Sequence, residues 1–254
     1  MRNPAPIYIG TSGWHYDHWK GCFYPIEIPP SEWLRYYSTH FHSAEINASF
    51  YRLPDEHTLS FWRDSTPNEF VFSIKANRFI THMKKLKDPQ STLPPFMERL
   101  SLLGAKLGPI LFQLPPRWHL NLDRLQSFMQ IVGTTYRCAF EFRDPSWFDP
   151  RVYSILTEHH AAFCIYDLNH QLSPMEITTD FVYIRLHGPG GPYQGNYDEH
   201  SLSVWAERIA AWQAQGKQVY CYFDNVQNGY APQNALMLQR MLNPSSSSLT
   251  IPAR

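Results

Sequence analysis

Charged or titratable side chains occupy alternate positions in several short apolar segments of this chain. Arg185 and His187 do so in FVYIRLH, Glu141 and Arg143 in FEFR, and Lys75 in FSIKAN. Lysine and arginine bind anionic groups and stabilise developing negative charge, whereas carboxylates and histidine transfer protons. If these segments converge in the fold, their residue types predict acid–base chemistry on a polar or anionic molecule.

The apolar segments that carry these side chains have the length and the β-branched or aromatic content of strands. We predict strands at Ile7–Gly10, Ala44–Asn47, Val71–Asn77, Ile110–Leu114, Cys138–Arg143, Ala162–Leu168, Phe181–His187 and Gln218–Asn225. The apolar spacing between most of them is helical. The clearest helices are one capped by Ser31 that carries Trp33 to Phe41, one over Leu122–Val132, and one over Leu202–Trp212 that stops at Gly216. The sixth connection, Asn169–Asp180, is too short and too interrupted by proline for a good helix.

Eight strands that alternate with helices predict an α/β fold, a single parallel eight-stranded (β/α)8 barrel of the TIM type over residues 1–243. A doubly wound open sheet is the alternative, but its GxGxxG phosphate turn has no counterpart here. Residues 244–254, PSSSSLTIPAR, contain few core-forming residues and are predicted to be a loose C-terminal tail.

In such a barrel one face of each strand packs against helices and the other fills the interior. Assigning the apolar set to the outside leaves polar residues inside, near the C-terminal end of each strand, where barrel enzymes bind their substrates. The predicted inward set is Tyr8, Ser12, Glu45, Asn47, Ser73, Lys75, Asn77, Gln113, Glu141, Arg143, Asp167, Tyr183, Arg185, His187, Tyr220, Tyr222 and Asp224.

These charges have two explanations, a ligand site or an ion network that only supports the fold. Apolar residues would fill a barrel at lower cost than buried charges, so we favour the ligand site. In that interpretation Glu45, Glu141 and Asp167 are candidate general acids or bases, and His187 is the candidate proton shuttle. Cations for an anionic substrate group are supplied by Lys75, Arg143 and Arg185.

Composition narrows the class of protein. Hydrophobic residues make up 43% of the chain and charged residues 17%, as in globular proteins, and Lys plus Arg equals Asp plus Glu at 22 each. The overall charge therefore gives no reason to expect nucleic acid or an anionic membrane as a partner. There is no apolar run of the ~20 residues that a membrane helix needs, no signal-peptide pattern and no CxxC pair, so we expect a cytoplasmic protein without a membrane partner.

Three loops are expected at the open end of the barrel. The first, Thr11–Pro25, contains His15 and His18, but no further ligand is fixed nearby, so neither a metal nor a cofactor is predicted. The seventh, Gly188–Tyr197, could bind phosphate through backbone N–H groups or act as a hinged lid that bears Tyr193. The third loop is basic, which suits a phosphate or a nucleic-acid backbone and equally an ordinary solvated surface; it carries Arg78, His82, Lys84, Lys85 and Lys87.

Seven segments follow one another along the chain as IGTSGWHYDHWKGCFYP, EINASFYRLP, FSIKANRFITHMKKL, LFQLPP, FEFRDPSWF, FVYIRLHGPGGPYQGNY and VYCYFDNVQNGYA. These motifs resemble those of the YecE-like family, also called domain of unknown function 72, over about residues 7–242. The resemblance implies a TIM-type barrel and no established reaction. The family positions that it implies are Thr11, Ser12, Gly13, Trp14, Glu45, Asn47, Tyr51, Lys75, Thr81, His82, Gln113, Glu141, Arg143, Trp147, Asp167, Arg185, His187, Gly188, Tyr193 and Asn225. His15 and Asp224 depart from the family pattern, which usually has a small polar residue and asparagine there.

Three functions are consistent with these residues. The first is a hydrolase or isomerase that acts on a small anionic, phosphorylated or sugar-like substrate. The second is a nucleic-acid-binding or repair protein of the endonuclease-like barrel type, although three interior cations would repel the metals that such enzymes use. The third is a non-catalytic sensor of a metabolite. The oligomeric state is not determined by the sequence.

Overall fold

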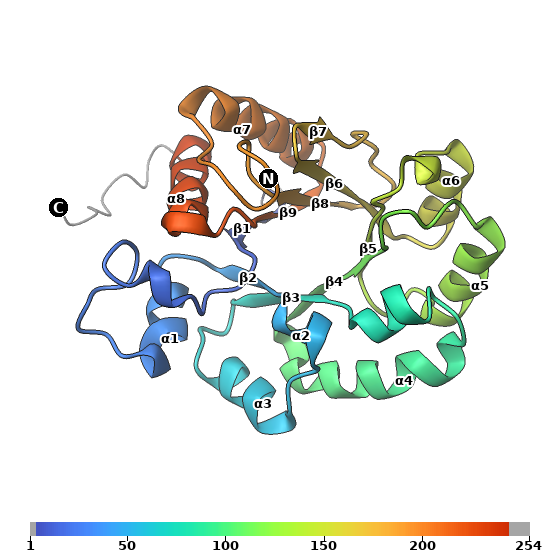
Figure 1. Ribbon diagram of the computed structural model, residues 1–254, viewed down its shortest axis with the longest axis horizontal. Helices are drawn as coiled ribbons and strands as arrows, with labels where there is room; N and C mark the ends of the chain where they lie inside the picture. Colours follow the sequence, from blue (N-terminus) through green and yellow to red (C-terminus); the bar gives the residue numbers. More distant parts are fainter. Residues whose placement is uncertain (1–3, 244–254) are drawn as a thin grey trace.

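Parallel strands form the wall of a barrel in the computed structural model, which describes residues 4–243 (Figure 1). The wall strands are β1 (Ile7–Thr11), β2 (Ser43–Ile46), β3 (Val71–Lys75), β4 (Leu107–Gln113), β5 (Cys138–Glu141), β6 (Ala162–Leu168), β8 (Phe181–Leu186) and β9 (Gln218–Phe223). They pair side by side in the order β1-β9-β8-β6-β5-β4-β3-β2, each parallel to its neighbour. The predicted TIM-type barrel is therefore confirmed.

Helices surround this wall and connect most of the successive strands (Figure 1). They are α1 (Trp33–Ser38), α2 (Ala48–Tyr51), α3 (Glu56–Asp64), α4 (Pro89–Leu100), α5 (Leu122–Val132), α6 (Pro150–Glu158), α7 (Glu199–Ala214) and α8 (Tyr230–Leu242). The predicted tail, residues 244–254, lies outside the described part of the chain, and the extent of a single domain over residues 1–243 stays a prediction.

The predicted helix boundaries are correct where capping residues define them. Asn121 accepts a hydrogen bond from the backbone N–H of Arg124 at 2.9 Å and starts α5, and Gly133, with φ of 62°, ends it. The predicted cap at Ser31 is wrong. Ser31 lies inside a short 3₁₀ turn, Pro30–Glu32, which leads directly into α1. Proline at the first position of that turn starts it without a side-chain cap.

The sixth connection has no helix, as predicted. It contains the two-residue strand β7 (Gln171–Leu172), which turns back and pairs antiparallel with the end of β6. The left-handed backbone of Asn169 and His170 forms the turn between them. This side of the barrel is therefore covered by extended chain.

The seam between β1 and β2 is closed by a side chain in place of a strand ladder. The Tyr37 hydroxyl accepts the backbone N–H of Thr11 at 2.9 Å and donates to the carbonyl of Ser43 at 3.1 Å. At Gly10 a Cβ atom would lie 2.1 Å from that carbonyl oxygen, so only glycine permits this approach. Just beyond the seam, Ser12 and Glu45 form a parallel bridge. Glu45 is thus held at the closing point of the barrel.

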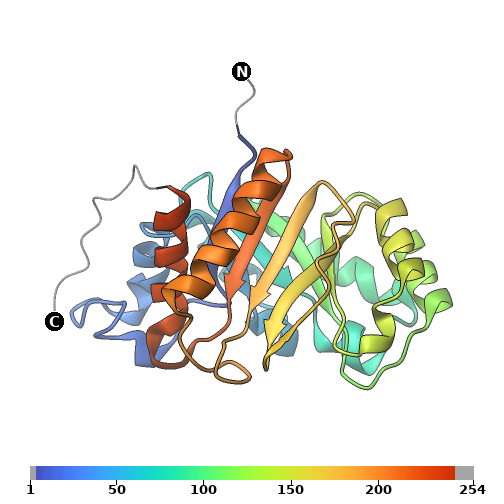
Figure 2. The ribbon, with the colours of Figure 1, turned by 90° about the horizontal axis from the view of Figure 1, so that it is seen from above.

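The interior of the barrel changes character along its axis. Its N-terminal part is apolar and aromatic, with Leu111, Ala139, Cys164, Phe181, Tyr183, Tyr220 and Tyr222. A hydroxyl layer follows, in which the Tyr222 hydroxyl bonds to Ser43 Oγ at 2.5 Å and to Ser73 Oγ at 2.8 Å. The charged residues come next, at the end toward which the strand arrowheads point in Figure 2. We call this C-terminal end the mouth.

Candidate functional site

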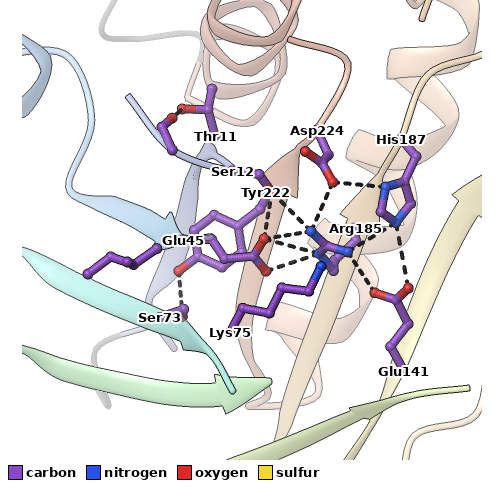
Figure 3. A network of polar contacts seen from close by, with 12 residues as sticks. Thr11, Ser12, Glu45, Ser73, Lys75, Glu141, Arg185, His187, Tyr222 and Asp224 are labelled. Atoms are coloured by element: carbon purple, nitrogen blue, oxygen red, sulfur yellow. Dashed lines mark hydrogen bonds and ion pairs between the residues drawn. The ribbon is translucent and has the colours of Figure 1, made fainter. Parts of the chain in front are cut away.

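Arg185 is the centre of the mouth. It is the inward residue near the end of β8 and is fully buried. Its guanidinium donates to Glu45 Oε1 at 2.8 Å, to Glu141 Oε2 at 2.8 Å and to Asp224 Oδ2 at 2.9 Å (Figure 3). An unpaired buried arginine would cost several kcal/mol, and three carboxylates from three different strand ends offset that cost here.

Glu45 has no hydrogen-bonding capacity left for a substrate. Besides Arg185, it accepts from Ser12 Oγ at 2.6 Å and from the Tyr183 hydroxyl at 2.7 Å. Its side chain is fully buried beneath the mouth. This geometry makes Glu45 the anchor that orients Arg185.

Glu141 is held between two arginines. Its Oε2 accepts from Arg185, while its Oε1 accepts from Arg143 Nε. Burial alone would raise the pKa of Glu141, but Arg143, Arg185 and His187 outweigh burial and hold the pKa well below its ordinary value. The pKa of Asp224 is also lowered, because Arg185 and His187 outweigh its burial. Both carboxylates are therefore ionised at neutral pH.

His187 is buried and neutral. Its Nε2 faces Arg143 Nη2 at 3.1 Å and Arg185 Nη1 at 3.3 Å, and both are donors, so Nε2 must accept and Nδ1 carries the proton. Nδ1 lies 3.1 Å from Asp224 Oδ2, although its N–H is not aligned for a good hydrogen bond. Burial and the two guanidinium groups lower the pKa of His187. With its lone pair held by two cations, this ring is poorly placed to accept a further proton.

The charges of the mouth balance. Glu45, Glu141 and Asp224 supply three negative charges, and Lys75, Arg143 and Arg185 supply three positive ones. All of these except Lys75 take part in the ion network.

Lys75 is the cation that the network leaves uncommitted. Its side chain points from the end of β3 toward Arg185 (Figure 3), and the residue is 9% exposed. Within residues 4–243 no carboxylate lies within 4.0 Å of its amine, which instead sits 4.5 Å from the centre of the Phe50 ring. Burial, followed by the charge of Arg185, lowers the pKa of Lys75 to about 8, despite the attraction of the mouth carboxylates.

Two amide side chains at the ends of the strands beside β3 also have free atoms. Asn47 Oδ1 and Gln113 Oε1 are buried and accept no hydrogen bond from the described residues. Ile46 pairs with Ile74 in the β2–β3 register, so Asn47 lies beside Lys75, while Gln113 ends the neighbouring strand β4 on the other side. A buried polar atom without a partner costs about 1–3 kcal/mol, and a bound ligand would remove that cost.

The loop after β3 borders the same corner. His82 packs against Phe50 at 4.9 Å between ring centres, and burial together with Lys75 lowers the pKa of His82 to about 4. Tyr51, in α2, is 73% exposed and packs edge-on against Phe50. His82 and Tyr51 therefore lie at the rim of the mouth, as the family resemblance implies. Phe50 was not predicted, and its position between two family residues in EINASFYRLP was the available signal.

The loop after β8 covers the opposite corner. Tyr193 has a left-handed backbone, with φ of 65°, and its ring meets that of His187 at 5.4 Å between centres. The Tyr197 hydroxyl accepts from the N–H of Gly188 at 3.0 Å, and Asn225 Nδ2 donates to the carbonyl of Gly195 at 2.8 Å. The loop is thus fixed at both ends, with Tyr193 over the network.

Asp167 does not face the interior, which corrects the prediction for the sixth strand. Ala162 and Cys164 belong to the interior cluster, whereas Ile165 packs outside, so the inward neighbour is Tyr166. The ring of Tyr166 lies beneath Arg143, 5.2 Å from its guanidinium carbon. Asp167 accepts from the Tyr197 hydroxyl at 3.0 Å on the outer side. The large apolar side chains of Phe163 and Ile165 pack against the helices, and Asp167 lies on the same face of the strand. The size of these side chains, and not the polarity of Asp167, was therefore the informative signal in the sequence.

Trp14 is likewise a core residue and not part of the mouth. Gly13 adopts φ of 84°, which interrupts the alternation of β1 and turns the next side chain outward. The Trp14 ring packs against Trp62 at 5.1 Å and Phe72 at 5.8 Å between centres.

Two predicted amides hold loops. Asn77 donates to the carbonyl of Ser49 at 3.0 Å and accepts from the N–H of Phe79 at 2.8 Å, so both ends of its amide are used. Asn225 bonds outward to Asn234 of α8 at 2.9 Å, and its Oδ1 stays free of partners among the described residues. Asn225 positions the loop that bears Tyr193 and does not contact the mouth network.

The two histidines of the first loop make separate contacts. His15 packs on the ring of Trp33 at 4.9 Å, and His18 Nε2 bonds to the carbonyl of Val226 at 2.8 Å. Within the described residues no group of three or more His, Cys, Asp or Glu side chains is arranged to hold a metal ion. No helix among residues 4–243 is long and apolar enough to cross a membrane.

Two cavities lie away from the mouth. One, of about 690 Å³, has Arg137 and Asp180 in its wall, and these two form an ion pair at 2.8 Å. The other, of about 440 Å³, lies outside β6 and is bordered by Asp167 and Trp205. Neither has Lys75 in its wall.

The fold and this cluster define a TIM-type barrel protein whose charged residues gather at the C-terminal ends of the strands. The family described as "protein of unknown function DUF72" matches residues 8–254, and the chain belongs to this family.

Similar proteins agree with this assignment. The UPF0759 protein YunF of Bacillus subtilis is 28% identical over 277 residues, which cover 96% of this chain and 97% of YunF. The UPF0759 protein YecE of Escherichia coli is 28% identical over 146 residues, which cover 56% of this chain and 50% of YecE. A crystal structure of a DUF72 protein from Thermotoga maritima has a TM-score of 0.85 with 29% identity, covering 93% of this chain and 99% of that one.

Proposed function

We propose that the mouth is the active site of an enzyme, of hydrolase or isomerase type, that performs acid–base chemistry on a small polar substrate with an anionic group. The observation that carries this proposal is Lys75, a buried lysine whose amine has no ion pair among the described residues, together with the free amide oxygens of Asn47 and Gln113 at the ends of the two neighbouring strands. A network that only supported the fold would gain from pairing this lysine. Its lone position supports a role toward a ligand.

The residues divide into two roles in this proposal. Glu45, Asp224 and His187 hold Arg185 and Arg143 in place, because their hydrogen bonds are spent within the network. Lys75 and Arg143 bind the anionic group, and the amides of Asn47 and Gln113 accept hydrogen bonds from substrate hydroxyls. Tyr193 closes over the bound substrate and excludes water.

Proton transfer in this scheme belongs to Lys75. A general acid or base works best when its pKa lies near the working pH, and the pKa of Lys75 is about 8. Glu141 is a weaker candidate, because its pKa is held low by Arg143 and Arg185 and it would have to displace an arginine to accept a proton.

Calorimetric titration with inorganic phosphate and a panel of sugar phosphates tests the proposal. We expect Lys75→Met to weaken binding about 10- to 100-fold, the range for a hydrogen bond to a charged group. Gln113→Leu should weaken the binding of sugar phosphates more than that of inorganic phosphate, because in this proposal the amide accepts hydrogen bonds from sugar hydroxyls. Lys20→Met, an exposed lysine in the first loop, is the control and should bind as the wild type does.

Equal binding by wild type and Lys75→Met, or no binding of any anion in the panel, would contradict the proposal. Duplex DNA with an abasic site is included as a competitor. Salt-sensitive binding of that DNA with no phosphate binding would instead favour a nucleic-acid partner.

A further inference from the structure

Lys75 differs from the other buried lysine in what surrounds its amine. Lys106 donates to the carbonyl of Arg63, to the carbonyl of Thr66 at 2.6 Å and to Thr66 Oγ1 at 3.1 Å, as a structural lysine does. The amine of Lys75 has no such acceptors among the described residues and rests against an aromatic ring. Among the described residues the amine of Lys75 is therefore free to meet a ligand, whereas that of Lys106 is fixed by acceptors of the fold.

The groups around Lys75 either favour or disfavour the charged form of its amine. Burial and the charge of Arg185, from β8, disfavour the ammonium form, whereas the face of the Phe50 ring, 4.5 Å from the amine, favours it. The carboxylates of Glu45, Glu141 and Asp224 attract the ammonium form, but each is already tied to an arginine. His82, on the loop after β3, is kept neutral in part by Lys75 itself. Enzymes that use lysine as a nucleophile activate it by desolvation and by a neighbouring cation.

We propose that Lys75 is a nucleophile that forms an imine with an aldehyde or ketone substrate bearing an anionic group. This inference rests on the proposed function and names its substrate class.

The bond changes are those of imine formation. The neutral Nζ attacks the carbonyl carbon, the C–N bond forms, and the π pair of the carbonyl moves to its oxygen. A proton passes from nitrogen to that oxygen and gives a carbinolamine. The hydroxyl then takes a second proton from solvent and leaves as water, and the nitrogen lone pair forms the C=N bond of a cationic iminium. Addition of water reverses these steps and releases the carbonyl compound.

The charge of the mouth favours this product. With Lys75 neutral, the two guanidinium groups of Arg143 and Arg185 face the three carboxylates of Glu45, Glu141 and Asp224, which leaves one net negative charge. A cationic iminium at Nζ offsets that charge, while the anionic group of the substrate pairs with Arg143. Asn47, just after β2, and Gln113, at the end of β4, offer free carbonyl oxygens to the carbinolamine hydroxyl.

The test uses pyridoxal 5′-phosphate, an aldehyde with a phosphate group, followed by borohydride reduction and peptide mass spectrometry. We expect the Lys75 peptide of the folded wild type to be modified at least 10-fold faster at pH 7 than the exposed Lys20 peptide. The fall in the pKa of Lys75 from 10.5 to about 8 raises the neutral fraction of this amine at pH 7 on the order of 10²-fold. Inorganic phosphate should slow this modification, and Lys75→Arg should abolish it with the circular dichroism unchanged.

Modification of Lys75 no faster than that of Lys20, or insensitive to phosphate, would overturn the imine proposal. If phosphate still binds in the calorimetric test and Lys75→Met weakens it, only the imine falls and the proposed function stands. If phosphate binding is absent as well, both fall. The effect of inorganic phosphate is measured on the wild-type protein, so the proposal can be tested even if Lys75→Arg misfolds.

Discussion

Replacement of Arg185 by methionine should lower the free energy of unfolding at pH 7 by about 3–5 kcal/mol, the cost of leaving buried charges without their partner. Glu45, Glu141 and Asp224 all depend on this one guanidinium, and Glu45 and Glu141 are fully buried. Urea unfolding followed by circular dichroism measures the loss. The matched control is Arg35→Met, an exposed arginine that pairs with Glu32 at 3.2 Å and should cost less than about 1 kcal/mol.

The deficit of Arg185→Met should shrink in acid. In the wild type the pKa values of Glu141 and Asp224 are lowered, so the stability they contribute is present above their unfolded pKa values and is lost as the pH falls below them. In the variant these carboxylates have lost most of that contribution already. The two proteins should therefore differ less at pH 4 than at pH 7. A deficit under 1 kcal/mol at pH 7, or one independent of pH, would contradict the role given to Arg185.

Replacement of Lys75 by methionine should have the opposite effect and raise the free energy of unfolding by about 3 kcal/mol at pH 7. The pKa of Lys75 falls from 10.5 to about 8 on folding, and each unit corresponds to about 1.4 kcal/mol. Because the folded pKa is the lower one, the charged lysine destabilises the fold below pH 8, and that penalty is relieved as the pH rises from 8 toward 10.5. The advantage of Lys75→Met should therefore decrease across this interval.

Lys106→Met is the control for this substitution. It removes a buried amine that donates to the carbonyl of Thr66, so it should destabilise the protein by about 1–3 kcal/mol. Urea unfolding at pH 7 and pH 10 measures both variants. If Lys75→Met destabilises the protein at pH 7 as Lys106→Met does, then the amine has a partner in solution and is not held ready for a ligand.

The strand pattern of the sequence predicted the barrel and the location of the polar cluster. Alternation placed Glu45, Glu141, Arg185 and Asp224 on one side of their strands, and the structure brings all four into contact. Alternation failed in β6, where Tyr166 is both bulky and polar and so fits either face. Trp14 was named only through the family resemblance, and after the left-handed backbone of Gly13 its ring packs in the core.

The pairing inside the cluster could not be predicted. Nothing in the chain says that Arg185 takes three carboxylates and Lys75 none, because this depends on how far each side chain reaches across the barrel. Local spacing also could not predict the role of Tyr37. This residue lies in α1, and its hydroxyl closes the seam between β1 and β2. The sequence therefore predicted where the polar cluster lies, and the contacts within the cluster come from the long-range geometry.

The central claim is that Lys75 is a buried, uncommitted amine at the mouth, and its titration tests that claim most directly. In protein labelled with ¹³C-lysine, the Cε resonance of Lys75, assigned by its loss in Lys75→Arg, reports the pKa by NMR. We expect a midpoint near the value of about 8, and a rise when inorganic phosphate is added, because a nearby anion favours the ammonium form. A midpoint at the ordinary lysine value of 10.5, unmoved by phosphate, would contradict both the geometry and the function proposed for this site.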